Sequence, residues 1–231
     1  MGLILNIESA TTNCSASLAE DGVLIATKQI DDGYRHAEQL APFVHEVLHT
    51  GGAKASQLDA VAVSAGPGSY TGLRIGVALA KGICYAQKLP LIAISTLRLM
   101  CASPLVREAA AKYTKVVLCP MLDARRMEVY KALYDIHLNE LSAPEPHVLG
   151  PNSLMEEAAA DTVLIFGPGA HKFNALNNNE RIVYVDGVKP DAALMPALSE
   201  PAWQQQNFEN LAYFEPAYLK SFVATKPKQV I

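Results

Sequence analysis

One segment of the chain has the residue types and spacing of a zinc protease motif: His45-Glu46-Val47-Leu48-His49. In such enzymes two histidines one helical turn apart bind the metal, and the glutamate acts as a general base. A helix of 3.6 residues per turn, however, places Leu40, Phe43 and Val44 on the face opposite both histidines. Because apolar residues face the core, we expect His45 and His49 to face solvent or a partner. The sequence therefore predicts neither a metal site nor a cofactor site here.

A glycine-rich segment, GPGSYTGLRIG over 66–76, has residues that could bind phosphate through backbone amides. Its spacing is not that of a dinucleotide-binding fingerprint, because Thr71 stands at the third glycine position. It is not that of a P-loop either, because Leu73 stands at the second glycine position and no Gly-Lys-Ser/Thr follows. Anion binding at the helix N-terminus stays open, and a tight strand-to-helix turn would explain Gly66 and Gly68 without a ligand.

The helix expected over Thr71–Gln87 is apolar over more than one face. Small residues recur every four positions, at Gly72, Gly76 and Ala80, and form a ridge that another helix could approach closely. A surface helix needs an apolar arc of only about 100°. We therefore predict a protein–protein interface, with a helix enclosed within its own domain as the alternative. The predicted interface residues on this helix are Gly72, Leu73, Gly76, Val77, Ala80 and Cys84.

These residues lie on a regular succession of expected elements. Strands are predicted over 3–7, 15–18, 23–30, 58–64 and 91–94, and helices over 36–49, 71–87 and 97–111. The Asp21-Gly22 step between apolar runs predicts a hairpin. Three meandering strands followed by alternating helices and strands are typical of a ribonuclease-H-like arrangement.

The second half of the chain repeats the pattern. Strands are expected over 115–122 and 127–134, around a turn at 123–126, and over 163–166, and the proline-rich segment 142–151 is expected to be irregular. Two such lobes make an α/β, two-lobe actin-like ATPase (ASKHA, duplicated ribonuclease-H-like) fold. We expect an N-terminal lobe over 1–105 and a C-terminal lobe over 106–214.

Composition and charge exclude several classes of protein. The 231 residues are 50% hydrophobic and 18% charged, which is close to the globular average and excludes a disordered or coiled-coil chain. A net charge of −4 does not resemble the basic face of a stand-alone nucleic-acid binder. The two basic concentrations, Arg125-Arg126 and the lysines at 220, 226 and 228, are expected to be solvated surface. No apolar run reaches the ~18 residues of a membrane span, so we expect a soluble, cytoplasmic protein without membrane contact.

Several stretches, taken in order, resemble one family. They are ILNIESATTNCSASL at 4–18, HAEQLAPFVHEVL at 36–48, AVSAGPGSYTGLRIGVALAKG at 62–82, LIAISTLRLM at 91–100, MLDARRMEVYKALY at 121–134, FGPGA at 166–170 and EPAYLK at 215–220. In this order and spacing, across nearly the full chain, they resemble the TsaB (YeaZ) family of tRNA threonylcarbamoyladenosine biosynthesis proteins.

The resemblance implies a non-catalytic subunit required for modification of the adenosine next to the anticodon of tRNA. The catalyst in that family is the paralogous transferase TsaD, which the subunit binds and activates together with the ATPase TsaE. In isolation the subunit forms a homodimer, and the pairing helices correspond to 36–49 and 71–87, which adds His36 and Leu40 to the expected interface. The resemblance also implies that tRNA is reached only indirectly and that residues 215–231 return to the first lobe.

The same resemblance implies that inherited reactive groups have been lost. Thr96 and Met100 stand where TsaD carries two metal-binding histidines, and neither replaces an imidazole as a metal ligand. Vestigial nucleotide loops are expected at Glu8, Ser9, Thr11, Gly66, Gly68, Asp123, Gly167 and Gly169, and Pro168 removes an amide donor from the last of them. Two alternatives stay open: an actin-like ATPase or kinase that uses Glu8 and Asp123 on Mg²⁺, and a glycoprotease-like peptidase.

Overall fold

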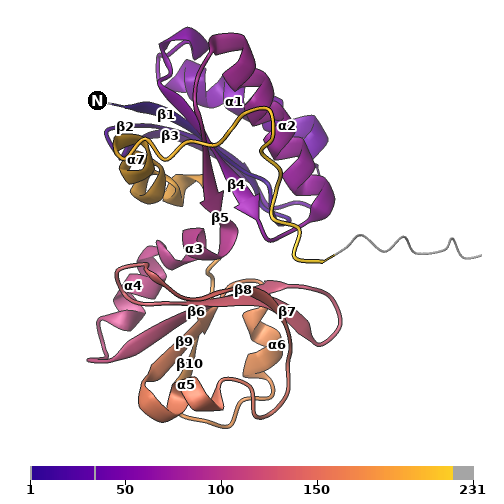
Figure 1. Ribbon diagram of the computed structural model, residues 1–231, viewed down its shortest axis with the longest axis vertical. Coiled ribbons are helices and arrows are strands. Elements are labelled where there is room, and N and C mark those ends of the chain that lie inside the picture. Colours follow the sequence, from indigo (N-terminus) through magenta and orange to yellow (C-terminus); the bar gives the residue numbers. More distant parts are fainter. Residues whose placement is uncertain (1, 34, 221–231) are drawn as a thin grey trace, which may run out of the picture.

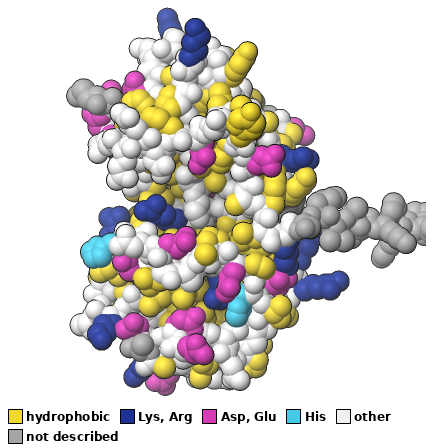
Figure 2. Space-filling model, in the orientation of Figure 1, with side chains coloured by type: hydrophobic (Ala, Val, Ile, Leu, Met, Phe, Trp, Pro, Cys, Tyr) yellow, Lys and Arg dark blue, Asp and Glu magenta, His cyan; other side chains and the backbone are white. Residues whose placement is uncertain are grey.

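The chain folds into two lobes, each built around a five-stranded sheet with helices packed against it (Figure 1). The computed structural model describes residues 2–33 and 35–220. In Figure 1 the first lobe lies above the second, and the last described residues run back along the first lobe toward the junction between the two. Figure 2 shows the same lobes in space-filling form, with charged side chains of both signs spread over this face.

The first sheet combines a meander with two parallel strands. Its members are β1 (Leu3–Glu8), β2 (Cys14–Glu20), β3 (Val23–Ile30), β4 (Ala60–Gly66) and β5 (Leu91–Ser95), in the order β3-β2-β1-β4-β5. The first three strands are antiparallel, and β4 and β5 run parallel to β1. Asp21 and Gly22 both have positive φ, which confirms the predicted hairpin turn. One face of this sheet is covered by α1 (His36–Thr50) and α2 (Tyr70–Gln87), with the short η1 (Ala55–Gln57) between them.

The second sheet repeats this topology. It contains β6 (Val116–Asp123), β7 (Glu128–Tyr134), β8 (Glu140–Val148), β9 (Thr162–Phe166) and β10 (Ile182–Val185), in the order β10-β9-β6-β7-β8. Within each lobe the first strand therefore lies at the centre, with the meander on one side and the parallel strands on the other. Helices α5 (Met155–Ala160) and α6 (Ala170–Asn174) precede and follow β9. The duplicated arrangement confirms the predicted fold class.

Proline explains both local differences from the expected elements. Residues 142–151, expected to be irregular, largely belong to β8, which lies at the edge of its sheet. Pro144 and Pro146 are tolerated there because one side of an edge strand forms no ladder hydrogen bonds. The helix expected over 97–111 is instead α3 (Thr96–Cys101) and α4 (Pro104–Ala110). Pro104 begins the second helix because a proline inside a helix removes a hydrogen bond and clashes with the preceding turn.

After β10 the chain returns to the first lobe. η2 (Ala192–Leu194) and α7 (Pro196–Gln204) pack on the face of the first sheet opposite α1 and α2, where Met195 and Leu198 share a core with Ile4. Both elements thus pack on the first lobe although they precede the expected boundary at residue 214. Of the expected return of 215–231, Ala217 is anchored to β4, since its amide donates to the Ala65 carbonyl at 2.7 Å. Residues 221–231 lie outside the described residues.

The small-residue ridge of α2 packs inside its own lobe. Gly72, Gly76 and Ala80 are all buried. A β-carbon at Gly72 would lie 2.1 Å from the carbonyl oxygen of Ser9, and one at Gly76 would lie 2.1 Å from the Ser9 Oγ. The ridge therefore lets α2 approach the loop after β1, which is the alternative that the sequence left open.

Replacing Gly72 with alanine should destabilise the fold, because the added methyl group would meet a backbone carbonyl that cannot rotate away. We expect a loss of about 1–3 kcal/mol in the free energy of unfolding, the usual effect of overpacking. Gly82→Ala is the matched control in the same helix, since a β-carbon there meets nothing within 4 Å. That change should stabilise the helix by about 0.5–1 kcal/mol. Urea denaturation measures both, and equal effects would contradict this packing.

Candidate functional site

The two histidines of the zinc protease motif lie on the exposed face of α1. His45 and His49 are both exposed, and their ring centroids lie 6.5 Å apart in a stacked arrangement. The prediction that they face solvent or a partner and not the core is confirmed. The exposed residues of the neighbouring helix α2 are Thr71, Arg74, Ala78, Gly82, Tyr85, Ala86 and Gln87.

The residues predicted to form the partner interface are buried within the first lobe. All eight are buried, namely His36, Leu40, Gly72, Leu73, Gly76, Val77, Ala80 and Cys84. A partner interface at these residues stays a prediction. In the isolated chain, α2 is covered by more than its own sheet. Leu211 and Phe214 of the returning chain pack against it, and the Lys81 ammonium donates to the carbonyl of Phe214 at 3.2 Å. Much of the apolar surface of α2 is thus buried within the first lobe.

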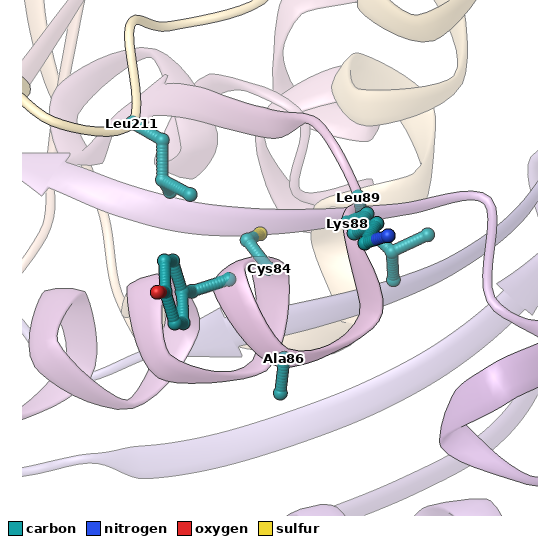
Figure 3. Close-up of a pocket in the computed structure, with 6 residues that line it drawn as sticks. Cys84, Ala86, Lys88, Leu89 and Leu211 are labelled. Carbon is teal, nitrogen blue, oxygen red and sulfur yellow. The ribbon is translucent and has the colours of Figure 1, made fainter.

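An apolar groove of about 570 Å³ remains open at the C-terminal end of α2 (Figure 3). It is lined by Cys84, Tyr85, Ala86, Lys88, Leu89 and Leu211. The Tyr85 side chain is 82% exposed, so a large aromatic surface stands beside the groove. Burial raises the pKa of the Cys84 thiol to about 11, so it stays protonated and is no nucleophile at neutral pH.

A second hollow, of about 330 Å³, lies between the two lobes. Thr11 and Asn13 line it from the first lobe, and Gly167, Pro168 and His171 line it from the second. The structure thus brings together residues from two of the expected nucleotide loops, those that follow β1 and β9. Further along the cleft, Asp31 accepts hydrogen bonds from Thr12 at 2.9 Å and from Lys189 at 2.9 Å, which links the lobes.

Glu8, at the end of β1, is fully buried beneath this loop. Its Oε1 accepts a hydrogen bond from the Ala10 amide at 2.5 Å, while its Oε2 has no partner among the described residues. Burial raises the pKa of Glu8 to about 8, against the lowering effect of the Ala10 amide and the Ser64 hydroxyl, and the nearby charge of Asp191 adds to the rise. A carboxyl group that is protonated at neutral pH is a poor ligand for Mg²⁺.

Two other amides of the loop after β1 also donate to oxygens of the protein. The Ser9 amide donates to the Ser64 Oγ at 3.3 Å, and the Asn13 amide donates to the Thr11 Oγ1 at 3.3 Å. A phosphate bound by a loop of this kind needs backbone amides that point outward. The amides of Ser9 and Asn13 are directed to the protein's own oxygens.

The other two expected nucleotide loops show the same internal bonding. The Arg125 amide donates to the Asp123 Oδ1 at 2.6 Å, and the Gly169 amide donates to the Met121 carbonyl at 2.9 Å. A β-carbon at Gly169 would lie 2.7 Å from the backbone of Leu122. Gly169 is therefore required by the close approach of the β9–α6 turn to β6, independently of any ligand.

Gly66 and Gly68 likewise serve the turn into α2. Gly66 has a φ of 98°, which favours glycine, and a β-carbon at Gly68 would lie 2.5 Å from the carbonyl oxygen of Ala10. The Ser69 side chain caps the helix by accepting from the Gly72 amide at 3.3 Å. The tight-turn interpretation of this segment accounts for both glycines.

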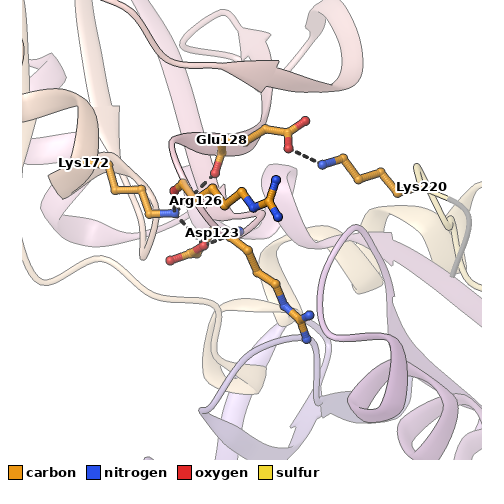
Figure 4. Close-up of polar contacts among 6 residues, drawn as sticks. Asp123, Arg126, Glu128, Lys172 and Lys220 are labelled. Carbon is orange, nitrogen blue, oxygen red and sulfur yellow. Dashed lines mark hydrogen bonds and ion pairs between the residues drawn. The ribbon is translucent and has the colours of Figure 1, made fainter. Parts of the chain in front are cut away.

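Asp123 does not join the interlobe hollow. It lies at the end of β6, where its carboxylate pairs with the Lys172 ammonium of α6 at 2.7 Å (Figure 4). Thr96 and Met100 are both fully buried in α3, and a β-carbon at Gly167 would lie 2.8 Å from the Met100 sulfur. Among the described residues, no group of three or more His, Cys, Asp or Glu side chains is placed to hold a metal ion.

One serine contacts a histidine in the second lobe, but the arrangement is not a hydrolytic triad. The Ser153 Oγ lies 3.1 Å from the His147 Nε2, while Glu145 lies 3.9 Å from the His147 Nδ1, beyond hydrogen-bond reach. The Glu145 carboxylate instead pairs with Lys131 at 3.0 Å. The Ser153 hydroxyl also caps a turn by accepting from the Gly150 amide at 3.0 Å.

The polar side chains that hold the returning chain were not predicted from the sequence. The Ser15 Oγ accepts from the Ala192 amide at 2.9 Å, the Ser17 Oγ donates to the Ala192 carbonyl at 2.7 Å, and the Ser199 Oγ donates to the Asn6 Oδ1 at 2.7 Å. One sequence signal could have indicated them. Serine alternates with apolar residues along β2, and this strand is buried on both faces, so its serines need polar partners.

Comparison with known proteins identifies relatives of this chain. Residues 33–230 match the TsaD family, tRNA N6-adenosine threonylcarbamoyltransferase. The chain is 30% identical to the tRNA threonylcarbamoyladenosine biosynthesis protein TsaB of Escherichia coli, over 96% of both chains. It is 24% identical to the TsaB protein of Haemophilus influenzae, over 96% of this chain and 95% of that one.

Two solved structures from Pseudomonas aeruginosa resemble the whole chain. One is an uncharacterized protein with similarity to peptidase YeaZ, which superposes with a TM-score of 0.79 at 26% identity. The other is YeaZ, with a TM-score of 0.75 at 26% identity. Each comparison covers 95% of this chain and 100% of the other. Within the described residues, no helix has the length and hydropathy needed to cross a membrane.

The buried state of Glu8 predicts a pH-dependent stability that Glu8→Gln removes. The pKa of Glu8 is about 8 in the fold, against an ordinary value of 4.5, so between these pH values the folded chain holds a proton that the unfolded chain releases. The free energy of unfolding should therefore fall as the pH rises through that interval, by up to roughly 1.4 kcal/mol per pH unit. Measured by denaturation, the free energy of unfolding of Glu8→Gln should be close to that of the wild type near pH 5 and higher than that of the wild type near pH 8. A difference that stays constant with pH would contradict the burial of a protonated Glu8.

Proposed function

The chain belongs to the TsaB (YeaZ) family, and we propose that it is a non-catalytic subunit that binds and activates a TsaD-like transferase. Its involvement in threonylcarbamoyladenosine modification of tRNA follows from the family. The observation that carries the proposal is the internal use of the loop after β1, where Glu8 is buried and protonated and the amides bond to the protein itself. The chain's contribution to the modification is then a surface and not a reactive group.

The partner surface of this proposal is the exposed stripe of α2, together with the apolar groove. Ala78 and Gly82 present small side chains to solvent, which lets a partner helix approach closely. Tyr85 supplies a large exposed aromatic surface at the end of the stripe, as is common at protein interfaces. The same stripe serves a homodimer when the transferase is absent, and a TsaE-like ATPase joins the assembled pair.

An actin-like ATPase or kinase is the competing proposal, favoured by the hollow between Thr11 and Gly167. Its volume of about 330 Å³ is at the lower end of the range for small-molecule sites. The bonded amides and the buried carboxyl of Glu8 weigh against phosphate and Mg²⁺ in it.

Calorimetry separates the two proposals. Titration of the isolated chain with ATP and Mg²⁺ should give no binding heat, because the phosphate-binding donors are already occupied. Titration of a known actin-like ATPase under the same conditions provides the positive control. Micromolar binding to this chain would favour the competing enzyme.

Ala78→Arg should abolish association with the transferase while leaving the fold intact, because the residue is exposed at the middle of the α2 stripe. Ala111→Arg, at an exposed position after α4 in the second lobe, is the matched control and should bind normally. Co-elution in size-exclusion chromatography measures association, and reconstituted tRNA modification measures activation. Modification should require the wild-type chain and should be lost with Ala78→Arg. Full modification without the chain would overturn the proposed function.

A further inference from the structure

Two basic segments that lie far apart in the sequence meet at the junction of the lobes. Lys220, at the end of the described chain, forms an ion pair with Glu128 of β7 (Figure 4). Arg125 and Arg126 occupy the turn immediately before that strand. Figure 2 shows Lys and Arg side chains gathered beside the point where the described chain ends.

Aromatic rings connect this cluster to α2. The Lys220 ammonium lies 5.9 Å from the ring centre of Tyr130, and two residues earlier the ring of Tyr218 packs 4.8 Å from that of Tyr70. The Arg74 guanidinium in turn lies 4.7 Å from the ring centre of Tyr70. We group these residues with the arginines of the neighbouring turn as the cationic band, which consists of Arg74, Tyr218, Lys220, Tyr130, Arg125 and Arg126.

Lys220 is paired with Glu128, but the three arginines of the cationic band have no acidic partner among the described residues. The two carboxylates beside the turn, Asp123 and Glu128, are each paired with a lysine. Over residues 2–33 and 35–220, no carboxylate forms an ion pair with Arg74, Arg125 or Arg126, and all three arginines are exposed. Three guanidinium groups are therefore available to an external anion.

The backbone of the turn indicates that the two arginines are not there for stability. Arg125 and Arg126 have φ angles of 69° and 47°, in the left-handed region that favours glycine and asparagine. A residue with a side chain costs roughly 1–2 kcal/mol there. The turn is held by its backbone groups, since the Arg125 amide donates to Asp123 and the Arg126 carbonyl accepts from Lys172. The two guanidinium groups take no part in these bonds.

From these contacts we propose that the cationic band binds the phosphate backbone of tRNA directly. Guanidinium groups match phosphate oxygens with paired hydrogen bonds, and the half-exposed ring of Tyr218 offers a stacking surface to an unpaired base. The inference rests on the proposed function, because the modification supplies the RNA. It replaces the expectation that tRNA is reached only indirectly.

The test is the affinity of the assembled complex of this chain and its transferase for a full-length tRNA transcript, measured by fluorescence anisotropy at several salt concentrations. Arg125→Glu/Arg126→Glu should weaken binding about 10-fold or more at low salt. It should also reduce the slope of log affinity against log salt by about 1 to 2, as expected for two lost phosphate contacts.

A matched control carries the same change of charge at a distant place. Lys112 and Lys115 are exposed residues before β6, and that strand's eight residues separate them from the turn by roughly 25 Å. Lys112→Glu/Lys115→Glu should leave the affinity within about twofold, because long-range effects are screened over that distance. A second variant, Arg125→Asn/Arg126→Gly, removes both charges with residues that the left-handed backbone favours. It should keep or raise the melting temperature and still weaken tRNA binding.

Three results would overturn the inference: equal loss in both Glu double variants, undiminished binding by the Asn/Gly variant, or loss of transferase binding with tRNA binding intact. The last result would indicate that the cationic band binds an acidic surface of the transferase. The proposed function is tested separately by omission of the chain from the modification reaction. If modification needs the chain while the band variants bind tRNA normally, only the RNA contact fails. If modification proceeds without the chain while the band variants lose tRNA, only the proposed function fails.

Discussion

The close approach of α2 to the loop after β1 constrains the rest of the first lobe. Because Gly72 and Gly76 have no side chains, the carbonyl and hydroxyl groups of Ser9 lie directly against the helix. With Ser9 held there, the loop turns its amides inward to Glu8 and Ser64, and the carboxyl group is sealed from water. The contact that fixes the helix therefore also goes with the inward direction of the Ser9 and Ala10 amides.

The opposite face of the same sheet depends on a late segment of the chain, η2 and α7. Ser15 and Ser17 would be buried hydroxyl groups without partners if residue 192 did not meet them. An unsatisfied buried polar group costs about 1–3 kcal/mol, so the N-terminal strands alone are an incomplete fold. The Asn6–Ser199 hydrogen bond adds a third such tie. The two lobes are consequently not independent units, because the second lobe lies between the halves of the first.

Local sequence patterns predicted most elements of the first lobe. They did not predict which segments pack over those elements. The Asp21-Gly22 turn, the face of α1 and the succession of strands in the first lobe follow from periodicity and turn chemistry. In the second lobe, β8 was expected to be irregular and β10 was not predicted. The burial of Val77 and Cys84 does not follow from such patterns, because an apolar circumference reveals that a helix is covered without revealing by what. Here the cover is partly the segment around Leu211, far along the chain. The pairing of Lys220 with the β7 region escaped prediction for the same reason, since it is a contact between segments that share no local pattern.

The exposed stripe of α2 divides into two chemically different ends. Arg74, near its start, belongs to the cationic band, whereas Tyr85, near its end, stands over the apolar groove. Eleven residues of helix separate these positions by roughly 16 Å along the axis. A partner helix that covers Ala78 and Gly82 therefore leaves the arginine end beside the second lobe, where Lys220 extends the same charge. One helix can in this way present a protein surface and an RNA surface at once, without either occupant displacing the other.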